Sequence, residues 1–180
     1  MAVVAPNERR TGLLIPVDAD SLVADFRIRY NAATVARRLP PHITVLFPFA
    51  RGVTVAETHG ADLGTHFAGF EPFEAELTGV GRFDSFVWLG PEPRERFVAL
   101  INATCNRFPE FPPYEGEGGK PEPHLTIAAV DDPARSESIA GIARAELEPR
   151  LPFRFTVDSV WLFEEQEDAT WRMSIRYELG

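Results

Sequence analysis

The sequence predicts an α+β fold of two similar lobes, in which two antiparallel sheets line a central cleft and helices lie outside. Two observations lead to this prediction. The expected elements run strand, helix, strand, helix, strand over residues 11–80 and in the same order over 86–163, with one closing strand over 171–177. Two short motifs of the same pattern, in "PPHITVLFPF" and "PEPHLTIAAV", lie at matching places in the two runs. We therefore expect one bilobal domain over residues 1–180, with a pseudo-twofold axis.

The first repeat begins with the short, branched apolar run "TGLLIPV" over 11–17, which is typical of a buried strand. A helix is expected over 18–39, with polar N-cap candidates at its start and Pro40 as its stop. The β-branched segment "HITVLFPF" predicts the next strand, and "VAETHGADLGTHFAGF" predicts a helix. "FEAELTGV" then alternates apolar and polar residues, which is the period of a half-exposed strand.

The second repeat follows the same order. "FVWLG" predicts a strand and "PRERFVALINATCNRF" a helix, before a proline- and glycine-rich loop over 109–123. "HLTIAAV" predicts a strand, and the next helix is expected to begin after Asp132 as N-cap, with Pro133 in its first turn. "FRFTVDSVWLFEE" and "WRMSIRYEL" alternate as long strands joined by an acidic turn.

Composition and charge narrow the classes of function. With 44 % hydrophobic and 25 % charged residues, the chain has the composition of a soluble globular protein, and no apolar run approaches the roughly 18 residues of a membrane span. The start of the chain has no long apolar segment after a basic stretch, so no secretory signal is expected. A net charge of −9 argues against binding long duplex nucleic acid, because such proteins carry a basic surface. The single cysteine, Cys105, fits a reducing compartment and is expected to pack. We expect a cytoplasmic monomer.

The two motifs place a histidine and a threonine on one face of each strand. Because side chains alternate along a strand, His42 shares a face with Thr44, and His124 shares a face with Thr126. The apolar residues between them share the other face, where they can pack against helices. If a pseudo-twofold axis relates the strands, the two polar faces meet across the cleft around one central volume.

Two histidines near neutral pH can divide the work of acid and base. A neutral imidazole accepts a proton from water, and a protonated one donates a proton to a leaving oxygen. The hydroxyls of Thr44 and Thr126 can donate to non-bridging phosphoryl oxygens, where negative charge grows in the transition state. The motifs therefore predict phosphodiester cleavage by His42, Thr44, His124 and Thr126, with neither a metal nor a cofactor.

Other interpretations are weaker. A lone histidine on a strand is more often structural, but the chain has only four histidines and eleven threonines. Two histidines that each carry an apolar flank and a threonine at i+2 arise by chance on the order of once in a thousand such chains. His59 and His66 lack the pattern and are expected to be surface or partly buried helix residues. A metal site needs three or four ligands, and the acidic turn "FEEQED" is explained by exposure. The chain has no Gly-x-Ser-x-Gly elbow and no P-loop.

The chain resembles the 2H phosphoesterase superfamily, and within it the 2'-5' RNA ligase-like proteins. That superfamily is defined by two His-x-Thr/Ser-x motifs, matched here by residues 42–45 and 124–127, and "LTGVGRFDSFVWLG" resembles its Gly-x-Gly-x-Phe hairpin. The resemblance covers the chain from about Thr11. It implies a bilobal α+β fold and metal-free cleavage of cyclic phosphodiesters, with 2'-5' linkage cleavage or ligation in some relatives. The chain departs at Ala129, where RNA-acting members tend to carry arginine.

Four further residues are predicted to bind the substrate. Phe83 can stack on a base, with a core position as the alternative. Tyr114 and Lys120 lie in the loop over 109–123, which can cover the cleft as a lid, and Lys120 or Arg82 can supply the missing cation. Solvated positions are the alternative for these three. The expected partner is a small cyclic nucleotide or an RNA end, and the alternative function is a non-catalytic nucleotide- or RNA-end-binding protein of the same fold.

Overall fold

A computed structural model describes residues 9–52, 55–116 and 121–180. The strands in this part of the chain are β1 (Thr11–Pro16), β2 (His42–Leu46), β3 (Phe73–Arg82), β4 (Phe86–Glu92), β5 (Leu125–Ala129), β6 (Phe153–Val157), β7 (Ser159–Glu165) and β8 (Trp171–Glu178). The helices are α1 (Asp20–Tyr30), α2 (Ala32–Ala36), α3 (Val55–Phe67), α4 (Arg94–Arg107) and α5 (Pro133–Leu147), with 3-10 turns η1 (Pro113–Gly116) and η2 (Glu148–Arg150). The predicted α+β class is confirmed.

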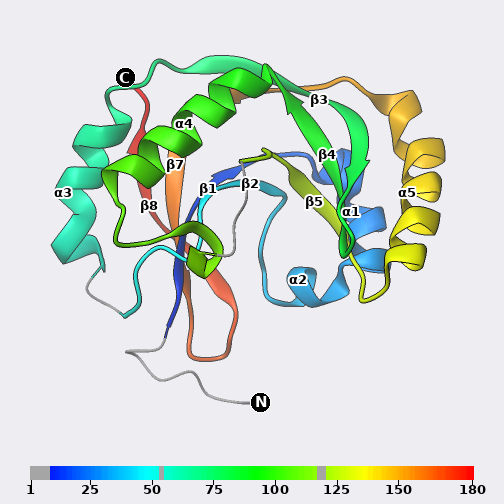
Figure 1. Cartoon of the computed structure of the whole chain (residues 1–180), viewed down its shortest axis with the longest axis horizontal. Coiled ribbons are helices and arrows are strands. Elements are labelled where there is room, and N and C mark those ends of the chain that lie inside the picture. The colour runs from blue at the N-terminus through cyan, green and yellow to red at the C-terminus, as the bar shows by residue number, and fades with distance from the viewer. Residues whose placement is uncertain (1–8, 53–54, 117–120) are drawn as a thin grey trace.

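All the strands named above form one antiparallel sheet in the order β6-β3-β4-β5-β2-β1-β7-β8 (Figure 1). The prediction of two separate sheets is wrong, because the two motif strands, β2 and β5, pair with each other through Ile43 and Leu125. This is a single paired position, whereas β1 and β7 or β3 and β4 pair along most of their length. Figure 1 shows the sheet curving, so the motif strands lie where its two four-stranded halves join.

Each half of the sheet takes strands from both predicted repeats. β3, from the first repeat, pairs with β4 and β6 of the second. In the other half, β7 from the second repeat pairs with β1 of the first and with the closing strand β8. The repeats therefore exchange strands, and neither forms a sheet by itself. That the two repeats share a common origin stays a prediction.

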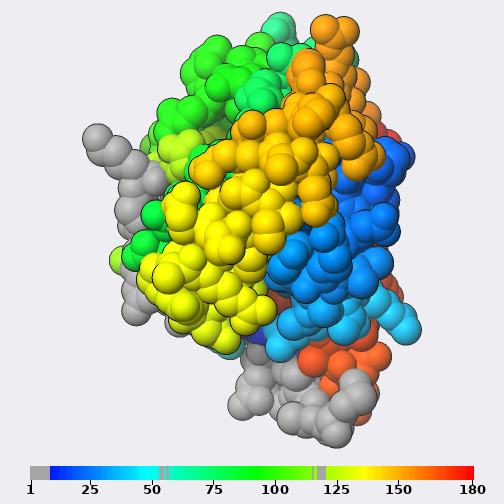
Figure 2. Space-filling view, turned by 90° about the vertical axis from the view of Figure 1, so that its right-hand side faces the viewer, coloured from blue at the N-terminus to red at the C-terminus, as the bar shows by residue number. Residues whose placement is uncertain are grey.

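Helices cover one face of the sheet. α1 and α5 pack against the half that contains β3, β4 and β5, whereas α3 and α4 reach β8 and β2 of the other half. Figure 2 shows α5 (yellow) and α1 (blue) lying side by side on one flank of the molecule. Ile43, Val45, Leu125 and Ile127 are buried in the continuous core beneath these helices, as the alternation predicts. None of the described helices is both long and apolar enough to cross a membrane.

Local signals explain some element boundaries and not others. The carboxylate of Asp132 accepts a hydrogen bond from the N–H of Ala134 at 3.0 Å, so the predicted N-cap of α5 is confirmed. The helix expected over 18–39 is broken instead. Asn31 has the non-helical angles φ −145° and ψ 37°, which end α1 and start the short helix α2. Asn31 is also buried, so tertiary packing overrides the helical pattern at this position.

Candidate active site

The motif side chains stand next to each other on one face of the sheet. β2 and β5 run antiparallel and pair at the residues between each histidine and its threonine. An antiparallel register through this one pair sets His42 opposite Thr126 and Thr44 opposite His124. All four side chains are half-buried, while their neighbours along the strands are buried on the helix side. The polar faces therefore do not meet across a gap between two sheets, as predicted, but lie side by side in one.

A backbone carbonyl fixes each imidazole. Nδ1 of His42 lies 2.7 Å from the carbonyl oxygen of Pro40, and Nδ1 of His124 lies 2.7 Å from that of Glu122. A carbonyl only accepts, so each Nδ1 carries a hydrogen and donates it. In the neutral ring, Nε2 is then the nitrogen that can accept a proton. Both rings are thus held in the same tautomer by the residue two positions upstream.

An arginine anchors the turn before each motif strand. The Arg27 guanidinium, from α1, donates to the carbonyl of Leu39 at 2.7 Å. The Arg94 guanidinium, from α4, donates to the carbonyl of Pro121 at 3.4 Å. Both carbonyls lie three residues before a motif histidine, and both arginines come from the first helix of a predicted repeat. Sequence reasoning missed this pair, because the two arginines occupy different positions in their helices: Arg27 lies in the last turn of α1, whereas Arg94 is the first residue of α4.

The charges around the two histidines differ. Burial lowers the pKa of His42 to about 4, opposed by the Pro40 hydrogen bond and assisted by the positive charges of Arg27 and His124. Burial also lowers the pKa of His124, but both the hydrogen bond to the Glu122 carbonyl and the negative charge of Glu122 raise it. Arg27 is only 4 % exposed, whereas Arg94 is paired with Glu122 at 2.7 Å.

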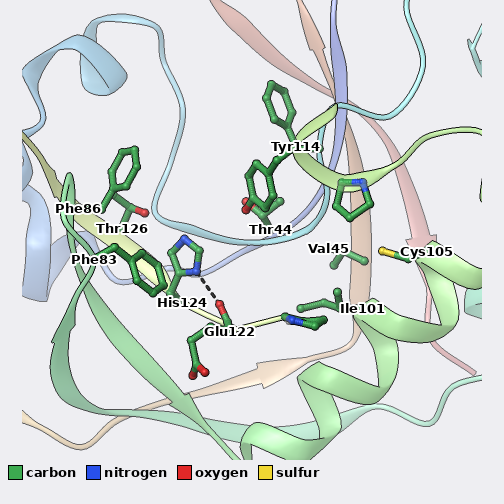
Figure 3. Close-up of a pocket in the computed structure, with 13 residues that line it drawn as sticks. Thr44, Val45, Phe83, Phe86, Ile101, Cys105, Tyr114, Glu122, His124 and Thr126 are labelled. Atoms are coloured by element: carbon green, nitrogen blue, oxygen red, sulfur yellow. Dashed lines mark hydrogen bonds between the residues drawn. The ribbon is translucent and has the colours of Figure 1, made fainter. Parts of the chain in front are cut away.

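A cavity of about 560 Å³ adjoins this group (Figure 3). Three motif residues line it, namely Thr44, His124 and Thr126. His42 is not among its lining residues and lies next to Thr126 on the neighbouring strand. The cavity wall includes four aromatic side chains, Phe47, Phe83, Phe86 and Tyr114, together with aliphatic residues such as Val45 and Ile101. Such a wall suits a flat, partly apolar ligand, and the motif residues provide the polar groups.

The predicted substrate-binding residues are only partly brought together. Phe83 and Tyr114 line the cavity and are 37 % and 47 % exposed. Tyr114 has a left-handed backbone (φ 51°), and its N–H donates to the Phe47 carbonyl at 2.8 Å. Arg82 does not line the cavity and forms an ion pair with Glu137 of α5. Lys120 lies outside the described residues.

Sequence reasoning also missed Trp88, whose ring lies tilted beside that of His124. Their ring centroids are 6.2 Å apart, and Phe83 meets the same imidazole edge-on at 5.2 Å and 89°. A Cβ atom on Gly81 would come within 2.2 Å of the Trp88 ring. The Gly-x-Gly spacing was a usable signal, because it marks where a neighbouring side chain approaches a strand backbone closely.

The remaining candidates lie where they were expected. His59 packs edge-on to Phe49, and Nε2 of His66 lies 3.0 Å from the hydroxyl of Thr104; both histidines are half-buried on α3. Cys105 is half-buried, and burial raises the pKa of its thiol, but it also lines the cavity. In the part of the chain that is described, no three His, Cys, Asp or Glu side chains group closely enough to hold a metal ion.

Comparison with known proteins agrees with this fold. The structure of Escherichia coli LigT complexed with 3'-AMP superimposes with a TM-score of 0.63 at 15 % identity, covering 95 % of this chain and 98 % of LigT. LigT complexed with NADP+ gives 0.61 at 16 %, covering 96 % and 98 %. The protein TT0787 of Thermus thermophilus gives 0.59 at 17 %, covering 94 % and 97 %. Identities this low show the fold alone, and no curated protein matches the sequence. The family model of the 2'-5' RNA ligase superfamily, however, matches residues 15–169, so the chain belongs to this superfamily of 2H phosphoesterases.

Proposed function

We propose that the protein is a metal-independent phosphodiesterase that hydrolyses a 2',3'-cyclic phosphate on a nucleotide or an RNA end. The observation that carries the proposal is the pairing of β2 with β5. It brings two imidazoles of the same tautomer and two threonine hydroxyls to one face of the sheet. A binding site for phosphate alone needs hydrogen-bond donors, but it does not need two imidazoles that can accept and donate protons.

In the proposed reaction, water attacks phosphorus while one bond from phosphorus to a ribose oxygen breaks. One histidine accepts the proton of the water at Nε2, and the other donates a proton to the departing ribose oxygen. Thr44 and Thr126 donate to the non-bridging oxygens, which gain negative charge as the new bond forms. The product is a phosphomonoester, and exchange with solvent restores the two protonation states.

The aromatic wall supports a nucleotide as the substrate. Phe83, Phe86 and Tyr114 are each more than a third exposed at the cavity, where a base can stack on them. The structural relative LigT has been crystallised with 3'-AMP and with NADP+, both of which carry an adenine base. The chain's net charge of −9 favours a small substrate or a short end over a long duplex.

The test is turnover in excess chelator. The purified protein is incubated with nucleoside 2',3'-cyclic phosphates, an RNA oligomer with a cyclic phosphate end, 2'-5' dinucleotides and ADP-ribose cyclic phosphate, and products are followed by ³¹P NMR. We expect at least one cyclic phosphate to open to a monoester, and His124→Ala to remove that activity. Undiminished turnover by His124→Ala, or turnover only with added metal, would refute the mechanism. Binding by calorimetry without turnover of any substrate would favour a non-catalytic nucleotide-binding protein.

A further inference from the structure

We propose that Trp88 is a positioning residue for His124, and that Gly81 is present because the Trp88 indole occupies the space of its missing side chain. What the inference predicts for turnover rests on the proposed function. Its structural part concerns the orientation of one imidazole and can be measured without a substrate.

The sheet register places Trp88 between the motif strand and the Gly-x-Gly strand. On one side Trp88 pairs with Thr126 of β5, and on the other it pairs with Gly81 of β3. Paired residues of neighbouring strands project from the same face of a sheet. The indole therefore stands on the face that carries the motif side chains, with its ring 6.2 Å from that of His124.

Gly81 is required for space and not for backbone conformation. A Cβ atom there would lie 2.2–2.5 Å from three carbon atoms of the Trp88 indole, which is far inside van der Waals contact. Gly52 and Gly116 are the described glycines with positive φ, so Gly81 keeps a backbone that other residues adopt. Gly79, two residues earlier on the same strand, has nothing within 4 Å of such a Cβ. The two glycines of the Gly-x-Gly sequence therefore have different roles.

Phe83 completes the aromatic contact with His124. Its ring lies 5.3 Å from that of Trp88 and 5.2 Å from the imidazole, at 89° to the latter. The Phe83 backbone is itself fixed. Its N–H donates to the Phe86 carbonyl at 2.8 Å, and its carbonyl accepts from the hydroxyl of buried Ser136 on α5 at 2.9 Å. The hairpin that carries Phe83 is thus tied to a helix on the far side of the sheet.

Packing, and not a polar bond, holds the indole in place. The Trp88 Nε1 atom is buried and has no hydrogen-bond partner among the described residues. The Nδ1 bond to Glu122 restrains one edge of His124, but the ring can still tilt about that bond. Contact with Trp88 and Phe83 restrains the tilt. Small displacements matter at a reacting centre, since an error of about 1 Å in position can cost about 100-fold in rate.

His42 provides an internal control. It has the same Nδ1 bond to a carbonyl two residues upstream. Over residues 9–52, 55–116 and 121–180, however, aromatic rings pack against His124 and none packs against His42. A change at Gly81 should therefore disturb one histidine and leave the other as it is. A general loss of structure would disturb both.

The experiment compares Gly81→Ala with Gly79→Ala by long-range ¹H–¹⁵N NMR, which reports the tautomer and the mobility of each imidazole. We expect the His124 signals of Gly81→Ala to shift and broaden, with the His42 signals unchanged and both sets unchanged in Gly79→Ala. Trp88→Leu serves as a second variant if Gly81→Ala fails to fold, and should give the same selective change. Unchanged His124 signals, or equal changes at both histidines, would overturn the inference.

Turnover gives the second readout. Gly81→Ala should lower kcat about tenfold with KM changed less than about twofold, because positioning acts on the transition state. The same change should have no further effect in the His124→Ala background. An added effect there would show that Gly81→Ala acts elsewhere. A wild type without turnover would refute the proposed function, while the NMR comparison would still decide the role of Trp88.

Discussion

The two motif strands use the same backbone geometry but differ in charge. Each histidine donates Nδ1–H to the carbonyl two residues upstream. In the turn before each strand, an arginine donates a hydrogen bond to the carbonyl three residues upstream of the histidine. At the first strand the arginine, Arg27, is buried close to His42. At the second strand Arg94 is exposed and paired with Glu122, and the negative charge of Glu122 raises the pKa of His124.

This difference predicts a separate role for each histidine in the proposed reaction. A buried cation favours the neutral form of His42, which can accept a proton, whereas a neighbouring carboxylate favours the protonated form of His124. We therefore expect His42 to be the general base and His124 the general acid. The backbone holds the two imidazoles in the same way, through the same Nδ1 hydrogen bond. The charge beside each ring, positive from Arg27 and negative from Glu122, shifts their pKa values in opposite directions.

The largest predicted effect comes from removing either imidazole. His42→Ala and His124→Ala should each lower kcat/KM for a cyclic phosphate by about 10³-fold or more, since general acid–base catalysis contributes about 10²–10⁴-fold per group. A nucleoside p-nitrophenyl phosphate diester separates the two, because its leaving group departs without a proton. On that substrate His124→Ala should recover most of its activity and His42→Ala should not. The reverse pattern would exchange the two roles.

The second prediction concerns stability against pH. Because folding lowers the pKa of His42 from its ordinary 6.5 to about 4, the unfolded chain binds more protons between these values. The resulting stabilisation is fully present above pH 6.5 and is lost as the pH falls toward 4. At pH 4.5, two units below the unfolded pKa, the loss amounts to about 2–3 kcal/mol, at about 1.4 kcal/mol per pKa unit.

Urea unfolding at pH 7.5 and pH 4.5 measures this loss. His42→Gln should lose about 2–3 kcal/mol less free energy of unfolding between the two pH values than the wild type does. His124→Gln should change the dependence in the same direction, because burial lowers the pKa of His124 as well. If His42→Gln and the wild type lose the same amount, His42 is not kept neutral by the fold.

The sequence predicted the features that depend on residues close together in the chain, and it missed those that depend on residues far apart. The motif faces, the burial of Ile43 and Leu125, and the Asp132 cap depend on positions within two residues of each other, and all three appear in the structure. The single sheet depends instead on one pairing between strands 82 positions apart, 43 with 125, which no local pattern encodes.

Register explains why Arg82 of β3 does not line the cavity. A bulge lies between Leu77 and Gly79, and it shifts the alternation of the strand by one residue. Leu77 therefore faces the helices, Gly81 faces the site under Trp88, and Arg82 faces α5, where it pairs with Glu137. A strand without the bulge would reverse the last two, and the bulge has no reliable signal in a single sequence.

The smallest predicted effect tests the charge that separates the two strands. The wild-type kcat/KM should rise as the pH increases through about 4, where His42 loses its proton, and should fall as the pH increases through the lowered pKa of His124. Arg27→Met removes a positive charge near His42, so the pKa of His42 should rise and the acid limb should move to higher pH. Arg27→Lys keeps the charge and should leave that limb in place.

The direction of the change at low pH decides between the two assignments. If His42 is the base, Arg27→Met holds more of it in the protonated, inactive form, and kcat/KM at pH 4.5 falls relative to the plateau. If His42 is the acid, the same substitution increases the active population, and kcat/KM rises at every pH between the two limbs. Arg94→Gln removes the partner of Glu122 and leaves the carboxylate unpaired beside His124, so it should move the alkaline limb to higher pH and not the acid limb. Opposite limbs moved by the two arginines would show that the charges beside the two motif strands tune different steps of one reaction.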